Sequence, residues 1–208
     1  MNKTGTYVKN LSGIASYESF RPTPLQDIKV DLDQEALDLL MKARTSLALL
    51  EGYSQAIVEL DVFVGSYVQK EALLSSQIEG TQATIEDILD IQSGVSTNLD
   101  VIEVVNYVKA MEHAMSIRKD LPLCNRFIKE IHYQLMSSGR GEDKTPGEFR
   151  VSQNWVGKAK SNLKTALYIP PNVEDMNHAL NDLENFLPSL ARSMPWIYTS
   201  LNGISSRA

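Results

Sequence analysis

The chain has 208 residues, of which 43% are hydrophobic and 22% charged, and its formal net charge is −6 at pH 7. This size fits one large domain or one domain with an extension, and the hydrophobic fraction is sufficient for a buried core. The acidic balance argues against a general nucleic-acid-binding surface, because phosphate binding needs clustered Lys and Arg. An apolar signal core and a membrane-length apolar run are both absent, so we expect a soluble, cytoplasmic protein without a membrane partner.

Few side chains in the sequence suit catalysis or metal binding. Cys124 is the single cysteine, so no intrachain disulfide forms, and its apolar neighbours favour a buried structural thiol. The three histidines, His113, His132 and His178, lie far apart without a metal-ligand spacing, and none precedes a Gly-rich phosphate loop. We therefore assign no catalytic residue and no metal site.

The N-terminal third is predicted to be an extension followed by two helices. Residues 1–32 are interrupted by Gly and Pro, which favours an irregular, extended segment. From Asp33 on, apolar residues recur at helical spacing. This pattern predicts one helix that ends near Gly52 and a second helix over residues 56–78 that is interrupted near Gly65.

The middle of the chain is predicted to hold three further helices. Thr84 stands three residues before Asp87, which resembles a capping box with Asp in place of the usual Glu, and the short helix that starts here should end at residues 93–94. Two helices with apolar stripes follow, over about residues 101–115 and 124–135. Such stripes are most simply core-forming faces.

The C-terminal third changes character. Residues 147–169 lose helical periodicity, and apolar residues flank the polar stretch 157–162, which predicts a β-hairpin with a flexible tip. Pro170 and Pro171 should end the hairpin before a last helix over about residues 173–187. The predicted fold is mainly α, a helical bundle with one β-hairpin and a single core.

The segment Ser75-Ser-Gln-Ile-Glu79-Gly80 has the most informative spacing. Ser75 and Glu79 are one helical turn apart, so a hydroxyl and a carboxylate share one helix face. Gly80 removes the side chain that would keep a neighbouring surface away. Such a face could hold a guanidinium or block the place of a phosphate. On spacing alone, a solvated helix patch that ends at Gly80 is the favoured interpretation.

Several segments, in the same order, resemble the Fic (filamentation induced by cAMP) family. They are residues 71–89, 106–110, 139–157, 168–171 and 182–184. The resemblance runs from about residue 7 to about residue 187 and implies a Fic-like helical bundle with one flap hairpin, incomplete at the C-terminus. It divides the chain into an N-terminal extension (1–32), a helical Fic N-terminal region with the inhibitory motif (33–95), a partial Fic core with the flap (96–187) and a divergent tail (188–208).

The resemblance implies protein adenylylation (AMPylation), the transfer of AMP from ATP to a hydroxyl of a target protein with Mg²⁺ as cofactor. Glu79 would be the inhibitory glutamate, whose carboxylate pairs with an arginine that otherwise holds the ATP γ-phosphate. Ser75 and Gly80 belong to the same nucleotide-gating motif. Within this chain, Arg140 and Arg150 are the candidate cations for Glu79.

The predicted hairpin would be the family's flap, which aligns the protein target along a strand edge. The residues assigned to target docking are Phe149, Arg150, Val151, Asn154, Trp155, Gly157, Leu167 and Tyr168. A plain surface hairpin, kept soluble by the lysines at its tip, is an equal alternative.

The family's catalytic loop, His-Pro-Phe-x-x-Gly-Asn-Gly-Arg, does not occur in this sequence. We therefore expect a truncated member of the AMP-transferase type that is catalytically inactive and does not bind ATP and Mg²⁺ productively. One alternative is a non-catalytic regulatory module that inhibits a complete Fic partner in trans through Glu79. Another is a helical interaction protein without nucleotide chemistry.

The same comparison with the family predicts an exposed apolar face. The missing helices would cover residues 101–136, and an uncovered apolar face favours association. We expect a homo-oligomer unless the tail around residues 196–198 folds back as a cover.

Overall fold

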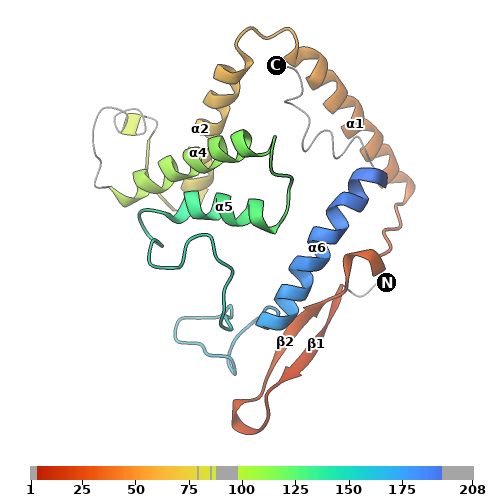
Figure 1. The fold of residues 1–208 in the computed structure, drawn as a ribbon, viewed down its shortest axis with the longest axis vertical. Helices are drawn as coiled ribbons and strands as arrows, with labels where there is room; N and C mark the ends of the chain where they lie inside the picture. Colours follow the sequence, from red (N-terminus) through yellow and green to blue (C-terminus); the bar gives the residue numbers. More distant parts are fainter. Residues whose placement is uncertain (1–3, 79, 85, 88–97, 194–208) are drawn as a thin grey trace. The chain divides into compact units, whose positions relative to one another are not determined.

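A computed structural model describes residues 4–78, 80–84, 86–87 and 98–193 (Figure 1). The elements, in chain order, are β1 (Gly5–Asn10), β2 (Tyr17–Pro22), α1 (Gln34–Ser54), α2 (Leu60–Ile78), α4 (Leu99–Ile117), α5 (Asn125–Met136) and α6 (Val173–Ser193), with 3-10 turns at Gly13–Ala15 and Leu25–Asp27. The expected mainly α fold with one β-hairpin is confirmed.

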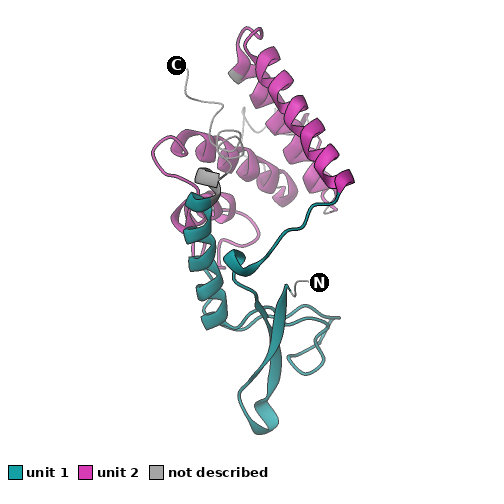
Figure 2. Cartoon of the chain, turned by 90° about the vertical axis from the view of Figure 1, so that its right-hand side faces the viewer, with its two compact units in different colours: residues 1–33, 149–197 teal, residues 34–148, 198–208 magenta. Residues whose placement is uncertain are grey.

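The chain divides into two compact units, coloured separately in Figure 2. The described residues of the first are 4–33 and 149–193, and we call it the terminal unit. Those of the second lie within 34–148, and we call it the helical unit.

The core of the helical unit lies where α2 and the turn after it meet α4. Ala72, Ala83, Val101 and Val104 form this core, and each is at most 1% exposed. The two alanines have the smallest apolar side chains, so the backbones of α2 and of the turn come close to α4. The core is therefore small. Helix α5 also packs against α4 (Figure 1).

The helix boundaries differ from the sequence prediction at two glycines. α1 continues past Gly52 to Ser54, and α2 runs through Gly65 without a break. A Cβ at Gly65 would meet no heavy atom within 4 Å in the part of the chain that the structure describes, so this glycine marks no close approach. Glycine inside a helix costs about 1 kcal/mol relative to alanine, which the surrounding turns tolerate.

The last helix also exceeds its predicted length. α6 was expected to end at residue 187, before Pro188, but it includes this proline and ends at Ser193. A proline inside a helix removes one backbone hydrogen bond and favours a bend without always ending the helix. The predicted cover around residues 196–198 lies outside the described residues.

The paired strands of the molecule lie at the N-terminus, where the sequence analysis predicted no pairing. β1 and β2 are antiparallel, with Gly5 opposite Pro22 and Asn10 opposite Tyr17. Leu11 and Gly13 in the connecting turn have positive φ angles of 57° and 62°, which reverse the chain. The signal was present as two short runs rich in Thr, Tyr, Val and Phe around a Gly-containing loop.

β2 is tied to the second half of the terminal unit. The backbone N–H of Phe20 donates to the carbonyl of Ile169 (2.9 Å). Arg21 forms an ion pair with the buried carboxylate of Asp175 on α6, with Nε and Oδ1 2.8 Å apart. The strand pair therefore belongs to the same folded unit as the segment 149–171.

The hairpin predicted over residues 147–169 is correct only in outline. The chain reverses there, but a single antiparallel bridge, between Val156 and Tyr168, replaces a ladder of paired strands. Pro170 and Pro171 follow, and neither has an N–H that could extend the ladder. Side chains bind their carbonyls instead.

Candidate functional site

The end of α2 carries the motif that the sequence analysis singled out. The N–H of Gly80 donates to the carbonyl of Gln77 (3.1 Å), and the N–H of Thr81 donates to that of Ser76 (3.1 Å). This pair of bonds is a Schellman closure, which needs a left-handed residue, and Gly80 has a φ of +96°. A Cβ on Gly80 would meet no heavy atom within 4 Å among the described residues, so conformation explains the glycine there.

The end of α2 that carries the motif is exposed to solvent. Ile78 is 88% exposed, Gly80 is exposed and Ser75 is half-buried. Glu79, the predicted inhibitory carboxylate, lies outside the described residues. The side chains next to it therefore define an accessible helix end that another molecule can reach.

The chain leaving this helix end is held firmly in place. The side chain of Gln77 donates to the carbonyl of Ala83 (3.3 Å), and Ala83 is only 1% exposed. The predicted capping box at Thr84 is confirmed: its N–H donates to the Asp87 carboxylate (2.8 Å), and the Asp87 N–H donates to its hydroxyl (3.2 Å). The Thr84 hydroxyl bond lowers the pKa of Asp87. The rest of the predicted short helix lies outside the described residues.

Arg140, one candidate cation for Glu79, has other partners. Its guanidinium binds the carboxylates of Asp100 (2.5 Å) and Glu103 (3.1 Å) on α4. The second oxygen of Asp100 accepts the backbone N–H of Gln82 (3.2 Å). The bond from Arg140, followed by that from Gln82, lowers the pKa of Asp100, and the bond to Asp100 raises the pKa of Arg140. Asp100 thus joins the turn after the motif to the loop after α5.

The loop after α5 is fixed to α4 at a second point, which the sequence analysis did not predict. The buried amide of Asn106, 4% exposed, donates to the carbonyl of Ser138 (2.9 Å) and accepts the hydroxyl of Ser138 (3.1 Å). Further along, the N–H of Gly147 donates to Nδ1 of His132 (2.8 Å). The available signal for Asn106 was a polar residue among apolar positions of a buried helix.

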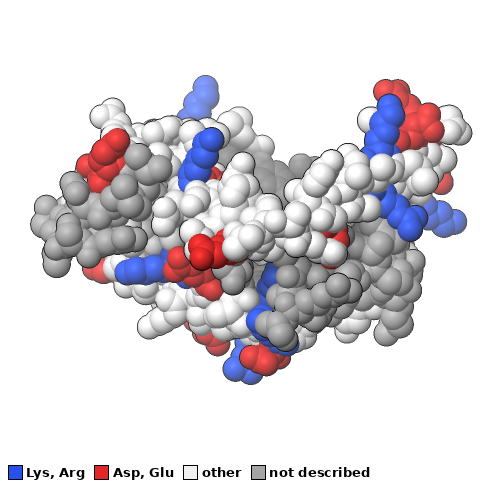
Figure 3. All heavy atoms as spheres, turned by 90° about the horizontal axis from the view of Figure 1, so that it is seen from above, with Lys and Arg blue, Asp and Glu red and all other residues white. Residues whose placement is uncertain are grey.

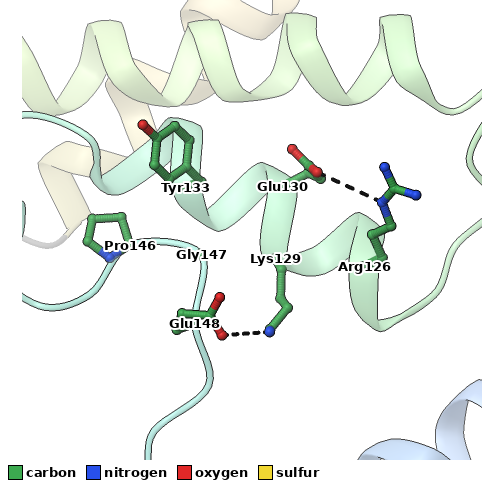
Figure 4. A pocket seen from close by; sticks show the side chains of 7 residues that line it. All are labelled: Arg126, Lys129, Glu130, Tyr133, Pro146, Gly147 and Glu148. Atoms are coloured by element: carbon green, nitrogen blue, oxygen red, sulfur yellow. Dashed lines mark hydrogen bonds and ion pairs between the residues drawn. The ribbon is translucent and has the colours of Figure 1, made fainter.

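A shallow groove of about 250 Å³ lies between α5 and residues 146–148 (Figure 4). Its two cations are paired: Lys129 with Glu148 (2.6 Å) and Arg126 with Glu130 (3.9 Å). This balance of charge does not favour binding of an anion such as a phosphate. Figure 3 shows blue basic and red acidic side chains next to one another in several places among the described residues.

The predicted target-docking residues lie together on one segment of the terminal unit. Val156 and Tyr168 form a bridge, and Trp155 and Leu167 are their neighbours in the chain. The indole N–H of Trp155 donates to the carbonyl of Ser161 (3.1 Å). Gly157 is needed for close approach, because a Cβ there would lie 2.3 Å from the Ser161 hydroxyl oxygen.

The remaining docking residues differ in exposure. Val151 and Leu167 are 90% and 76% exposed, Asn154 is exposed, and Phe149 is half-buried. Arg150, the other candidate cation for Glu79, donates to the carbonyls of Ser152 and Pro171, and partial burial lowers its pKa. It therefore supports the base of the segment, while the apolar side chains face solvent.

No three His, Cys, Asp or Glu residues gather into a possible metal site within the described residues. Within the same residues, none of the helices combines the length and the apolar character that crossing a membrane requires.

A family model described as Fic/DOC family N-terminal matches residues 37–116, which lie within the helical unit and include α2 with the Gly80 turn. No curated protein matches the chain. The resemblance noted over residues 7–36 and 117–187 stays a prediction, and so do the site roles.

Proposed function

We propose that this chain takes part in protein adenylylation and that its role there is to gate the nucleotide. The premise is that residues 37–116 form a Fic/DOC family N-terminal region. Gating here means control over whether ATP adopts the pose from which AMP is transferred. The observation that carries the proposal is the accessible end of α2, where Ile78, within the motif residues 75–80, is 88% exposed. A carboxylate presented there repels a γ-phosphate and pairs with the arginine that would hold it.

The partners of the two candidate arginines favour gating in trans. Arg140 is bound to Asp100 and Glu103, and Arg150 donates to backbone carbonyls. We therefore assign the arginine that pairs with Glu79 to the catalytic segment of a complete Fic protein. In this account ATP and Mg²⁺ bind to that protein, and this chain, whose sequence has no His-Pro-Phe-x-x-Gly-Asn-Gly-Arg loop, transfers no AMP alone.

Segment 149–169 is the proposed docking site for the protein target. Val151 and Leu167 present exposed apolar side chains on this segment, whose chain reversal includes the bridge between Val156 and Tyr168. An extended peptide can add to such an edge through backbone hydrogen bonds, with the apolar side chains giving selectivity.

An AMP-transfer assay tests the proposal. The chain is incubated with labelled ATP and Mg²⁺, alone and with a complete Fic enzyme from which the inhibitory glutamate has been removed. We expect no labelled protein from the chain alone and strongly reduced labelling by the enzyme when the chain is present. Glu79→Ala should restore labelling, whereas Glu86→Ala, which changes another nearby carboxylate, should not.

Two results would overturn the proposal. Labelling by the chain alone, with or without Glu79→Ala, would contradict its inactivity. Full labelling by the enzyme at a saturating concentration of the chain would contradict gating in trans.

A further inference from the structure

Segment 149–169 of the terminal unit carries charge of one sign. It contains one arginine, three lysines and no Asp or Glu, whereas the whole chain has a net charge of −6. The lysines are Lys158, Lys160 and Lys164, and all are exposed. Among the described residues, none of them pairs with a carboxylate. Because Arg150 binds backbone carbonyls, the lysines supply the accessible positive charge of the segment.

The lysines lie on a tip, residues 157–165, whose backbone is held by its own hydrogen bonds. The N–H of Ser161 donates to the carbonyl of Lys158 (2.9 Å). The side chain of Asn162 accepts the N–H of Lys164 (2.9 Å). Since these bonds fix the backbone before any partner arrives, the tip can present its charges without a large ordering cost on binding.

Residues 155–157, next to the tip, form the outer edge of a small set of paired segments. Val156 and Tyr168 exchange two backbone hydrogen bonds, of 2.8 and 3.1 Å. On its other side, the chain at Tyr168 is bonded to β2, because the carbonyl of Ile169 accepts the N–H of Phe20 (2.9 Å). Among the described residues, the segment around Tyr168 is therefore paired on both sides and residues 155–157 are paired on one.

The backbone groups of this outer edge are available to a further strand. In an antiparallel pair, the residues beside a hydrogen-bonded pair direct their N–H and C=O groups to the opposite side. Trp155 and Gly157 are those residues, and within the part of the chain that the structure describes no hydrogen bond involves their backbone groups. Side chains alternate between two faces here, so Val156, 59% exposed, and Trp155, 41% exposed, offer apolar surface on opposite faces.

These features together fit an extended peptide with acidic residues. A peptide that pairs with residues 155–157 passes Gly157 and reaches Lys158 and Lys160, where Asp or Glu side chains are attracted to the ammonium groups. A nucleic acid would use the lysines but could not continue the strand pairing, because a phosphate backbone has no alternating N–H and C=O groups. The chain's net charge of −6 also disfavours a nucleic acid.

From the free edge, the exposed apolar side chains and the lysines, we propose that segment 149–169 selects protein targets whose docking strand is flanked by Asp or Glu. The proposal rests on the proposed target-docking role of this segment and names the class of target that it accepts. Backbone pairing sets the register of the peptide, and attraction between opposite charges selects among peptides.

Binding of short fluorescent peptides to the chain, measured by fluorescence anisotropy at low ionic strength, tests the proposal. The acidic probe has alternating Val and Thr residues with Glu at both ends, and the basic probe has Lys in place of Glu. We expect the acidic probe to bind at least about tenfold more tightly, and added salt should reduce this difference. Methylation of the backbone nitrogens of the acidic probe removes its N–H donors and should weaken its binding.

Charge reversal on the chain locates the site. The double variant K158E/K160E should abolish the preference for the acidic probe, because it replaces two attractive charges with repulsive ones. The matched control is K42E/K70E, which reverses two exposed lysines on α1 and α2 and changes the net charge equally. This control should keep the preference. Thermal unfolding checks that both variants remain folded.

Equal binding of the two probes, or no binding of either, would overturn the proposal. So would a preference that K158E/K160E leaves unchanged, or a methylated probe that binds as tightly as the unmethylated one. Tighter binding of a fluorescent single-stranded oligonucleotide than of the acidic probe would assign the lysines to nucleic acid instead. None of these measurements involves ATP or AMP transfer, so failure here leaves the gating proposal standing, and failure of gating leaves the expected peptide binding unchanged.

Discussion

Helices α1 and α4 have similar lengths, 21 and 19 residues, and lie in the same helical unit, but they are packed in opposite ways. α4 lies between α2 and α5 and buries Val101, Val104, Asn106 and Ala110, whereas α1 buries no residue. Both are apolar, and both were predicted from helical periodicity. The difference teaches that periodicity predicts a helix but does not identify the surface that covers it.

A charge introduced into each helix should give the largest difference in unfolding free energy between α4 and α1. Val104→Asp places a carboxylate at a position with 0% exposure, and an unpaired buried charge should cost at least about 3 kcal/mol of unfolding free energy. Leu50→Asp, at an exposed position of α1, should change the unfolding free energy of the single chain by less than about 0.5 kcal/mol. Urea unfolding at low protein concentration measures both. Equal losses would contradict the different packing of the two helices.

Asn106 should have the next largest effect. Asn106→Ala removes the two hydrogen bonds with Ser138 and leaves the Ser138 carbonyl without the amide donor. This loss should lower the unfolding free energy by about 1–3 kcal/mol. Ser138→Ala removes only the hydroxyl bond and should cost less, about 1 kcal/mol. Chemical unfolding of both variants gives the order. A larger loss for Ser138→Ala would show that the buried amide does not anchor the loop.

Two glycines of the motif-bearing helix should respond with opposite signs. Gly80→Ala forces an alanine into a φ of +96°, which should cost about 1–2 kcal/mol. Gly65→Ala lies within α2 with room for the Cβ among the described residues, and should stabilise the chain by up to about 1 kcal/mol. Thermal unfolding compares them. If Gly80→Ala were neutral, the Schellman closure of α2 would be wrong.

The smallest expected effect concerns pH. Arg140 holds the pKa of Asp100 below its ordinary value of 3.8. A lowered folded pKa contributes stability that is present above the ordinary value and is lost as pH falls through the folded one. The stability difference between the wild-type chain and Arg140→Gln should therefore shrink as pH falls below about 4. Unfolding midpoints between pH 6 and pH 2 measure it, with Arg126→Gln as control. A constant difference would contradict the role of this pair.

The features predicted from sequence are those decided by neighbouring residues. The Thr84–Asp87 capping box and the helix end at Gly80 depend on side chains and backbone within one turn, so local spacing was sufficient. The pairing of β1 with β2 and the bonds of Arg140 to α4 depend on partners far along the chain, which spacing does not identify.

The segment 149–169 shows an intermediate case. Its chain reversal followed from the loss of helical periodicity, but its apolar residues suggested a ladder that the structure replaces with one bridge. The prolines at 170 and 171 were visible in the sequence and lack the N–H groups that a ladder needs. Arg150 was proposed as a cation for a distant carboxylate, yet it binds carbonyls within its own unit.

The gating role is tested most directly by nucleotide binding to a complete Fic enzyme that lacks its own inhibitory glutamate. Calorimetric titrations with ATP and with ADP are made in the presence and absence of this chain. A carboxylate that takes the place of the γ-phosphate should weaken the binding of ATP and leave that of ADP unchanged, and Glu79→Ala should abolish the difference. Unchanged ATP affinity, or equal weakening for ATP and ADP, would contradict the account.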